Sequence, residues 1–183
     1  MPELRKRLIH AFRWIDLGPG STHMVSDASG WWRDPFILAG LGPALADLFR
    51  PERPTVVVAP EVTGYLLGPL VATALGVGFV GAVKEGADRQ IAEPMTWART
   101  SDDYRGRALG LGVRSRHIGP GDRVLVVDDW VSTGAQVRAL YDVVRQLRAT
   151  PVGCAAIVAE PPALASDLAD LPVRALLTPD SLP

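Results

Sequence analysis

The sequence predicts an α/β fold: a single domain with a mostly parallel sheet flanked by helices. Short apolar runs of strand length alternate along the chain with segments that have helical periodicity. At least three of these runs are apolar throughout, which is typical of parallel strands buried on both faces. The 183 residues, 48% of them hydrophobic, suit one domain with a core of ordinary size.

The N-terminal part of the chain predicts two helices and the first strand of the sheet. Apolar residues recur at helical spacing over residues 3–15 and predict an amphipathic helix, which the segment DLGPGST ends. A second helix is predicted from Pro35, a favourable residue for a first helical turn, to Phe49. After RPERP, the β-branched run TVVVA predicts a buried strand, and a glycine turn then leads into the apolar helix GYLLGPLVATALG.

The rest of the chain predicts further strands and a helix around one polar stretch. GFVGAV (78–83) is a predicted strand, and residues 84–121 then become polar, which favours a functional loop or a hairpin. RVLVVDD restores a buried strand, and the next segment has the apolar face of a helix. VGCAAIVA and VRALLT are predicted as the last two strands.

Composition excludes several classes of protein. With 19 basic and 20 acidic residues the net charge is -1, so nothing global indicates a nucleic-acid or membrane partner. The single cysteine, Cys154, excludes an internal disulfide, and its apolar neighbours predict a buried, inert thiol. The sequence shows no signal peptide and no apolar run of membrane-spanning length. We therefore expect a cytoplasmic protein.

The segment VLVVDDWVSTGAQ carries the clearest chemical signal. Asp128 and Asp129 end a buried strand, and ligands of open parallel sheets bind at this edge. Two carboxylates there can accept hydrogen bonds from a vicinal diol or hold Mg²⁺ through water. The following STGA offers backbone N–H groups, hydroxyls and a glycine capable of positive φ at a helix N-terminus, which together predict a phosphate cradle. We therefore predict a site for a phosphorylated sugar.

Alternative roles for this segment fit the sequence less well. One of the two carboxylates could serve only to cap the following helix. A nucleotide P-loop is excluded because GxxxxGK[ST] does not occur, and GxGxxG is missing from every predicted strand-to-helix turn.

The segment VLVVDDWVSTGA resembles the 5-phosphoribosyl-1-pyrophosphate (PRPP) motif of the type I phosphoribosyltransferases. The resemblance implies that Asp128 and Asp129 contact the ribose hydroxyls. It implies that the 5-phosphate is held by the loop that follows, namely Ser132, Thr133, Gly134, Ala135 and Gln136, with Val131 as a further substrate-binding residue. The implied reaction displaces pyrophosphate from the anomeric carbon, with Mg²⁺ as the cofactor that neutralises the leaving group.

More distant segments are similar to the adenine branch of that family. In APEVTGYLLGPLVATALGVGFVGAVKEG the pyrophosphate segment matches at Glu61, Gly64, Tyr65 and Lys84. Thr63 and Val83 stand where that branch has arginines. Lys84 and Thr63 are therefore predicted to face pyrophosphate.

Two further segments supply the remaining candidate residues. WWRDP resembles the hood over the base, which makes Trp32 and Arg33 candidates for base binding. Asp103 and Tyr104 fall near the Glu-Tyr pair of the family's mobile catalytic loop. Their neighbours, Arg105 and Arg107, would replace the missing arginines as pyrophosphate leaves.

The resemblance implies one phosphoribosyltransferase-like domain, residues 1–183, and a division within it. Residues 1–50 form the helices and hood, residues 51–160 the PRPP-binding core with a mobile loop at about 86–118, and residues 161–183 the C-terminal segment. The first hypothesis is an enzyme that joins PRPP to a purine-like base, active as a homodimer and without nucleic-acid or membrane partners. The second is a PRPP-binding regulator that has lost turnover, which the missing arginines favour and the loop residues disfavour.

Overall fold

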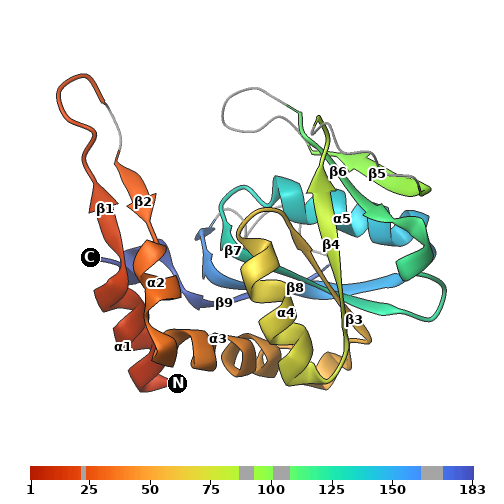
Figure 1. Cartoon of the computed structure of the whole chain (residues 1–183), viewed down its shortest axis with the longest axis horizontal. Coiled ribbons are helices and arrows are strands. Elements are labelled where there is room, and N and C mark those ends of the chain that lie inside the picture. The colour runs from red at the N-terminus through yellow and green to blue at the C-terminus, as the bar shows by residue number, and fades with distance from the viewer. Residues whose placement is uncertain (22–23, 87–92, 101–107, 162–170) are drawn as a thin grey trace.

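A central sheet of seven strands organises the molecule in a computed structural model that describes residues 1–21, 24–86, 93–100, 108–161 and 171–183 (Figure 1). The strand order is β5-β6-β4-β3-β7-β8-β9. The five strands from β4 to β9 in this order are parallel, whereas β6 and β5 add an antiparallel edge. The strands are β3 (Val56–Pro60), β4 (Gly78–Lys84), β5 (Met95–Arg99), β6 (Gly110–Arg114), β7 (Arg123–Val131), β8 (Thr150–Ala159) and β9 (Val173–Leu177).

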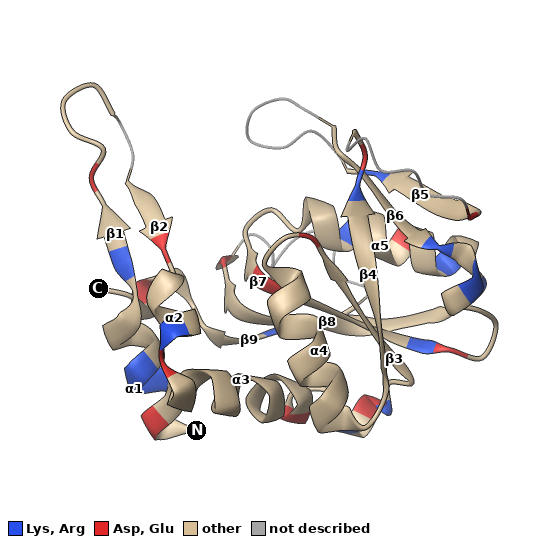
Figure 2. Cartoon of the chain, in the orientation of Figure 1, with Lys and Arg blue, Asp and Glu red and all other residues tan. Residues whose placement is uncertain are grey.

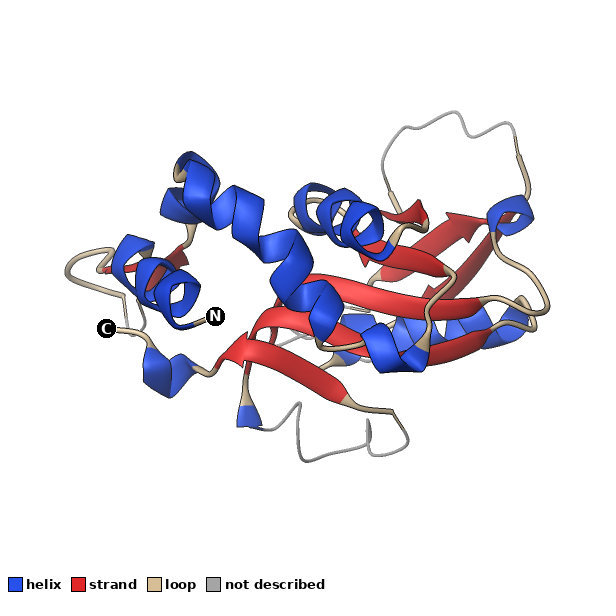
Figure 3. Cartoon of the chain, turned by 90° about the horizontal axis from the view of Figure 1, so that it is seen from below, coloured by secondary structure: helices blue, strands red, loops and turns tan. Residues whose placement is uncertain are grey.

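Helices cover both faces of this sheet (Figure 3). The helices and short 3-10 turns are α1 (Pro2–Ala11), α2 (Ser29–Arg33), α3 (Pro35–Asp47), η1 (Arg50–Glu52), α4 (Gly64–Leu75), η2 (Ser115–His117), α5 (Ala135–Gln146) and η3 (Pro179–Ser181). Helices α3 and α4 pack on one face, where Val57 and Leu125 are fully buried. Helix α5 packs on the other, where Val58 and Val126 are fully buried. This alternation buries both faces of the central strands, as the continuous apolar runs predict.

The first predicted helix is too long at its C-terminal end. Helix α1 ends at Ala11, and Phe12 adopts an extended backbone. The chain then forms β1 (Arg13–Ile15), which pairs antiparallel with β2 (Val25–Asp27) in a separate two-stranded sheet. Phe12 is fully buried from this extended backbone, whereas Ile15 is 43% exposed. Phe12 is therefore apolar because it packs in the core from an extended backbone, and not because it continues the apolar face of the helix.

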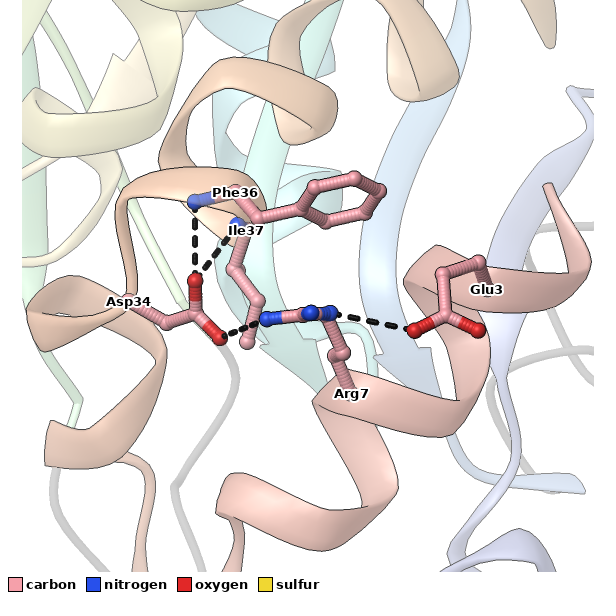
Figure 4. Close-up of polar contacts among 5 residues, drawn as sticks. All are labelled: Glu3, Arg7, Asp34, Phe36 and Ile37. Atoms are coloured by element: carbon pink, nitrogen blue, oxygen red, sulfur yellow. Dashed lines mark hydrogen bonds and ion pairs between the residues drawn. The ribbon is translucent and has the colours of Figure 1, made fainter.

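The second predicted helix is confirmed as α3, which begins at Pro35 as predicted and ends at Asp47, two residues before the predicted end; its N-terminus is tied to α1 (Figure 4). Asp34 accepts hydrogen bonds from the backbone N–H groups of Phe36 at 2.8 Å and Ile37 at 3.4 Å, which caps the helix. Its second carboxylate oxygen pairs with Arg7 of α1 at 3.1 Å. Arg7 also pairs with Glu3 and lies over the Phe36 ring, 4.6 Å from its centroid. The start of α3 thus holds the N-terminal helix in place.

The polar stretch 84–121 contains a hairpin, one of its two predicted forms. Strand β5 pairs with β6 along five residue positions, from Met95 opposite Arg114 to Arg99 opposite Gly110. Residues 87–92 and 101–107 of this stretch lie outside the described part of the chain.

Two smaller predictions concern Cys154 and membrane spans. Cys154 is fully buried in β8, and burial raises the pKa of its thiol, as expected for an inert cysteine. Within the described ranges, no helix is both long and apolar enough to cross a membrane.

Candidate functional site

The acid pair lies near the C-terminal end of β7, the central strand of the parallel part of the sheet. The sequence prediction that the two acids end the strand is wrong by two residues, because the pairing with β8 continues through Trp130 and Val131. The four preceding residues, Val124 to Val127, are fully buried between β3 and β8. Asp128 is only 6% exposed, whereas Asp129 is half-buried. Basic and acidic residues occur on several elements, from α1 to the β5–β6 hairpin (Figure 2), and the net charge of the chain is only -1. Any anion site must therefore be built locally.

A pocket of about 340 Å³ opens beside Asp128, a size suited to a small molecule, whereas Asp129 is not in its described lining. It is bounded by the end of β4, the base of the β5–β6 hairpin, the end of β7 and the loop leading into α5. Its described lining consists of Lys84, Thr100, Leu109, Asp128, Trp130, and every residue of the stretch 131–137. The structure thus brings together eight of the residues predicted from sequence: Lys84, Asp128, Val131, Ser132, Thr133, Gly134, Ala135 and Gln136.

The loop after β7 has the geometry of an anion cradle. Gly134 has φ of +75°, a conformation that favours glycine, and it directly precedes α5. Thr133 and Ser132 are exposed at the pocket, and the Thr133 hydroxyl accepts a weak hydrogen bond from the Ala135 N–H at 3.3 Å. The first N–H groups of a helix point out of its N-terminus, where the helix dipole also favours negative charge. A phosphate is therefore the natural ligand of this loop.

The surroundings of the Asp128 carboxyl group disfavour its ionised form. Burial raises its pKa well above the usual range, and the neighbouring charge of Asp129 raises it further. A hydrogen bond from the Asp129 N–H to Asp128 Oδ1 at 3.0 Å and the charge of Lys84 act in the opposite direction. Because an ionised Asp128 is costly when buried, hydroxyl donors or a cation in the pocket would stabilise it.

Glu61 organises the neighbouring edge of the pocket. Its backbone N–H donates to the Ala82 carbonyl at 2.9 Å, and its Oε1 accepts the backbone N–H of Lys84 at 2.8 Å. The end of β3 is thereby fixed to the end of β4, and the half-buried Lys84 side chain borders the pocket. Thr63 lies at the N-terminus of α4 and is not part of the pocket's described lining. Val83 is buried.

The hairpin between β5 and β6 closes at the rim of the pocket. Thr100 donates its backbone N–H to the Leu109 carbonyl at 2.8 Å, and its hydroxyl accepts the Leu109 N–H at 2.9 Å. Both residues border the pocket, although the sequence pattern predicts no role for them. The predicted loop residues Asp103, Tyr104, Arg105 and Arg107 lie outside the described residues.

The candidate base-binding residues of the hood lie elsewhere in the described structure. Trp32 and Arg33 belong to α2, and neither is in the pocket's described lining. The adjacent Trp31 is fully buried and donates its indole N–H to the Leu8 carbonyl at 2.8 Å. Instead, the aromatic ring at the pocket belongs to Trp130. The signal available in the sequence was its place directly after the acid pair.

The part of the chain that the structure describes contains no metal site made of protein ligands alone. Within the described ranges, no group of three or more His, Cys, Asp or Glu side chains could hold a metal ion. Mg²⁺ keeps several waters and is commonly bound by one or two carboxylates together with substrate phosphates. The donor set of Asp128 and Asp129 fits that second kind of binding.

Comparison with known proteins agrees with this geometry. Residues 35–171 match the phosphoribosyl transferase domain family. An adenine phosphoribosyltransferase from Oenococcus oeni is 38% identical over 129 residues, which cover 67% of this chain and 71% of that protein. The crystal structure of adenine phosphoribosyltransferase from Rhodothermus marinus superposes with a TM-score of 0.82 at 26% identity, covering 97% of this chain and 99% of that one.

A more distant structure shares the same fold. It is the adenine phosphoribosyltransferase of Trypanosoma brucei, solved in complex with AMP, pyrophosphate and ribose 5-phosphate. Its TM-score is 0.79 at 22% identity, with 98% of this chain and 81% of that one covered. The domain match, the O. oeni relative and the fold together show that this chain belongs to the phosphoribosyltransferase family.

Proposed function

We propose that the protein transfers the ribose 5-phosphate group of PRPP to a purine-like base, with adenine as the favoured base, and releases pyrophosphate. The observation that carries this proposal is the joint placement of Asp128 and the loop 131–136 in one pocket. A carboxylate beside a phosphate cradle matches the two polar ends of a ribose 5-phosphate, its diol and its phosphate. The relatives from O. oeni and R. marinus support the adenine assignment.

In this proposal the acid pair and the loop hold the ribose phosphate from opposite ends. Gly134 and the first turn of α5 receive the 5-phosphate, with the Ser132 and Thr133 hydroxyls as additional donors. Asp128 and Asp129 accept hydrogen bonds from the ribose hydroxyls. Two fixed ends place the anomeric carbon for attack by the base, and such positioning lowers the barrier by reducing the entropy lost in the reaction. The two carboxylates also stabilise the positive charge that develops on the sugar ring.

The pyrophosphate side relies on Lys84 and on the loop at the hairpin tip. Lys84 is the one cation in the described lining of the pocket. In the sequence, Arg105 and Arg107 fall between Thr100 and Leu109, the two hairpin residues that border the pocket. We therefore propose that Arg105 and Arg107 stabilise departing pyrophosphate, with Asp103 and Tyr104 assisting proton transfer to or from the base. These loop cations would compensate for Thr63 and Val83.

Mg²⁺ is part of this proposal as a cofactor that arrives with the substrate. When bound, it neutralises charge on the pyrophosphate leaving group. Asp128 and Asp129 would hold it through water, while Lys84 supplies a second positive charge on the same side of the pocket.

The alternative is a regulator that binds PRPP without turning it over. The observation in its favour is the small number of cations for pyrophosphate. Positions 63 and 83 carry a threonine and a valine, and Lys84 is the one basic residue in the described lining of the pocket. Such a protein would bind PRPP and nucleoside monophosphates but would form no product.

The deciding experiment offers PRPP and Mg²⁺ with a panel of purine and pyrimidine bases and identifies the nucleotide formed. We expect AMP from adenine to be the fastest product. If PRPP binds in a calorimetric titration but no base yields a nucleotide, the regulator is the correct function. Product formed faster from a pyrimidine would contradict the adenine assignment.

Three further expectations remain proposals: a homodimer, a cytoplasmic location, and the absence of nucleic-acid or membrane partners. Light scattering of the purified protein at micromolar concentration tests the first, and fractionation of the source cells tests the second. Retention on DNA, RNA or anionic lipid vesicles would contradict the third.

A further inference from the structure

Trp130 occupies a special position between the acid pair and the phosphate loop. It directly follows Asp129 in β7, is half-buried, and borders the same pocket as Asp128. Its place in the sequence is equally compatible with plain packing above the sheet. Its contacts show instead that the ring is held from several directions, in a residue that also borders the pocket.

Three interactions fix the orientation of the Trp130 ring. Its indole N–H donates to Glu160 Oε1 at 2.8 Å, which connects it to the residue after β8. Its face stacks on Phe12, with ring centroids 6.0 Å apart and an interplanar angle of 28°. The Trp14 ring meets it edge-on at 6.0 Å and 76°. A ring held by one hydrogen bond and two neighbouring rings has little freedom to rotate.

The two neighbouring rings come from the N-terminal segment. Phe12 lies between α1 and β1, and Trp14 lies in β1; their centroids are 5.0 Å apart. Phe12 also contacts the buried Trp31 of α2 at 5.8 Å. Figure 1 shows α1, β1, β2 and α2 gathered at one side of the molecule, away from α5 and the β5–β6 hairpin. The ring cluster of Phe12, Trp14, Trp31 and Trp130 therefore joins this segment to the end of β7.

We infer that Trp130 is a positioning residue that docks the N-terminal segment against the pocket and thereby sets the affinity for the base portion of the ligand. The inference rests on the proposed function. In the proposed function the diol end is held by Asp128 and Asp129 and the phosphate end by residues 132–136. The printed hydrogen bonds of Asp128 and Thr133 are made within these two segments and not to the ring cluster. Loosening the cluster should therefore weaken base binding selectively.

Two ligands that differ by the base alone test this selectivity. AMP and ribose 5-phosphate share the phosphate and the diol, so the ratio of their affinities reports the base portion. We expect Phe12→Leu to weaken AMP binding about tenfold, equivalent to about 1.4 kcal/mol, while ribose 5-phosphate affinity changes less than about twofold. Phe12 is absent from the pocket's described lining, so an effect of its substitution on binding is indirect and passes through the ring cluster, of which Trp130 is the member that borders the pocket. Trp130→Leu should reproduce this pattern, and Trp130→Phe, which retains a ring for stacking, should restore most of the AMP affinity.

Trp97→Leu is the matched control. Trp97 is 38% exposed on β5 and belongs to neither the ring cluster nor the described pocket lining, so both affinities should stay unchanged. Should Phe12→Leu fail to fold, Trp14→Leu removes a less buried ring of the same cluster and takes its place. Thermal melting shows which variants are folded at the assay temperature.

The outcomes separate this inference from the proposed function. If the wild-type protein does not bind ribose 5-phosphate, the proposed function fails. If it binds both ligands but the Phe12 and Trp130 variants leave the affinity ratio unchanged, the proposed function stands and the inference is overturned. A parallel loss of both affinities in folded variants also overturns it, because a general structural role predicts that pattern.

Discussion

Asp128 combines burial with a proposed role in ligand binding, so replacing it with asparagine should change stability and binding in opposite directions. The substitution keeps the size of the side chain and an oxygen that accepts the Asp129 N–H. It removes the charge that burial penalises and that the ribose diol is proposed to need.

The sign of the stability change follows from the raised pKa. Below the ordinary value of 3.8, Asp128 is protonated in both the folded and the unfolded chain, and the charge costs nothing. As the pH rises toward the higher folded pKa, the unfolded chain releases its proton first and becomes favoured. Each unit by which folding raises the pKa removes about 1.4 kcal/mol of stability above that folded value. Asparagine does not titrate, so the variant avoids this loss.

Urea unfolding at pH 5 and pH 8 measures this effect. We expect Asp128→Asn to be more stable than wild type at pH 8, with a smaller difference at pH 5. Asp142→Asn is the matched control, because Asp142 is an exposed carboxylate on α5 paired with Arg145, and its stability should change by less than about 0.5 kcal/mol. A wild-type protein more stable than Asp128→Asn at pH 8 would refute the reasoning about burial.

Binding should change the other way. A lost charged hydrogen bond costs about 1.5–3 kcal/mol, so ribose 5-phosphate affinity should fall roughly 10- to 150-fold in Asp128→Asn. Calorimetric titration at pH 8 measures this, again with Asp142→Asn as control. Unchanged affinity would place the diol elsewhere.

Three other substitutions test separate parts of the molecule. Gly134→Val should abolish binding of AMP and ribose 5-phosphate in calorimetry, because a β-branched residue resists the positive φ; retained binding would place the phosphate elsewhere. Replacing Arg105 and Arg107 together with glutamine should slow kcat about 100-fold, roughly 2.7 kcal/mol, with only a several-fold change in PRPP affinity; a loss of affinity alone would favour the regulator. Asp34→Ala should lower Tm, because α3 loses its cap and its tie to α1; an unchanged Tm would contradict that role.

The sequence predicts best where local pattern and tertiary packing agree. The short apolar run before Asp128 is typical of a buried strand, and Gly134 directly before an amphipathic segment is typical of the start of a helix. Both therefore locate β7, α5 and the cradle between them. The same pattern locates Asp129 next to Asp128, but it does not predict that Asp128 is buried and Asp129 only half-buried.

The sequence predicts less where packing between distant segments decides the structure. The end of α1 depends on Phe12 meeting Trp130, a residue far along the chain, and helix periodicity carries no information about that contact. For the same reason the sequence does not reveal that Trp130 borders the pocket, while the role of Trp32 in base binding stays a prediction. Thr100 and Leu109 join the pocket only because β6 crosses back beside β4, a pairing that polar composition does not reveal.

The most direct test of the central claim is release of pyrophosphate from PRPP in the presence of adenine and Mg²⁺, compared between wild type and the double variant Asp128→Asn/Asp129→Asn. The wild-type protein should release pyrophosphate and form AMP in equal amounts, and the folded double variant should do neither at a comparable rate. A wild-type protein that binds PRPP yet releases no pyrophosphate with adenine or any other base would contradict the claim, as would a double variant that retains wild-type turnover.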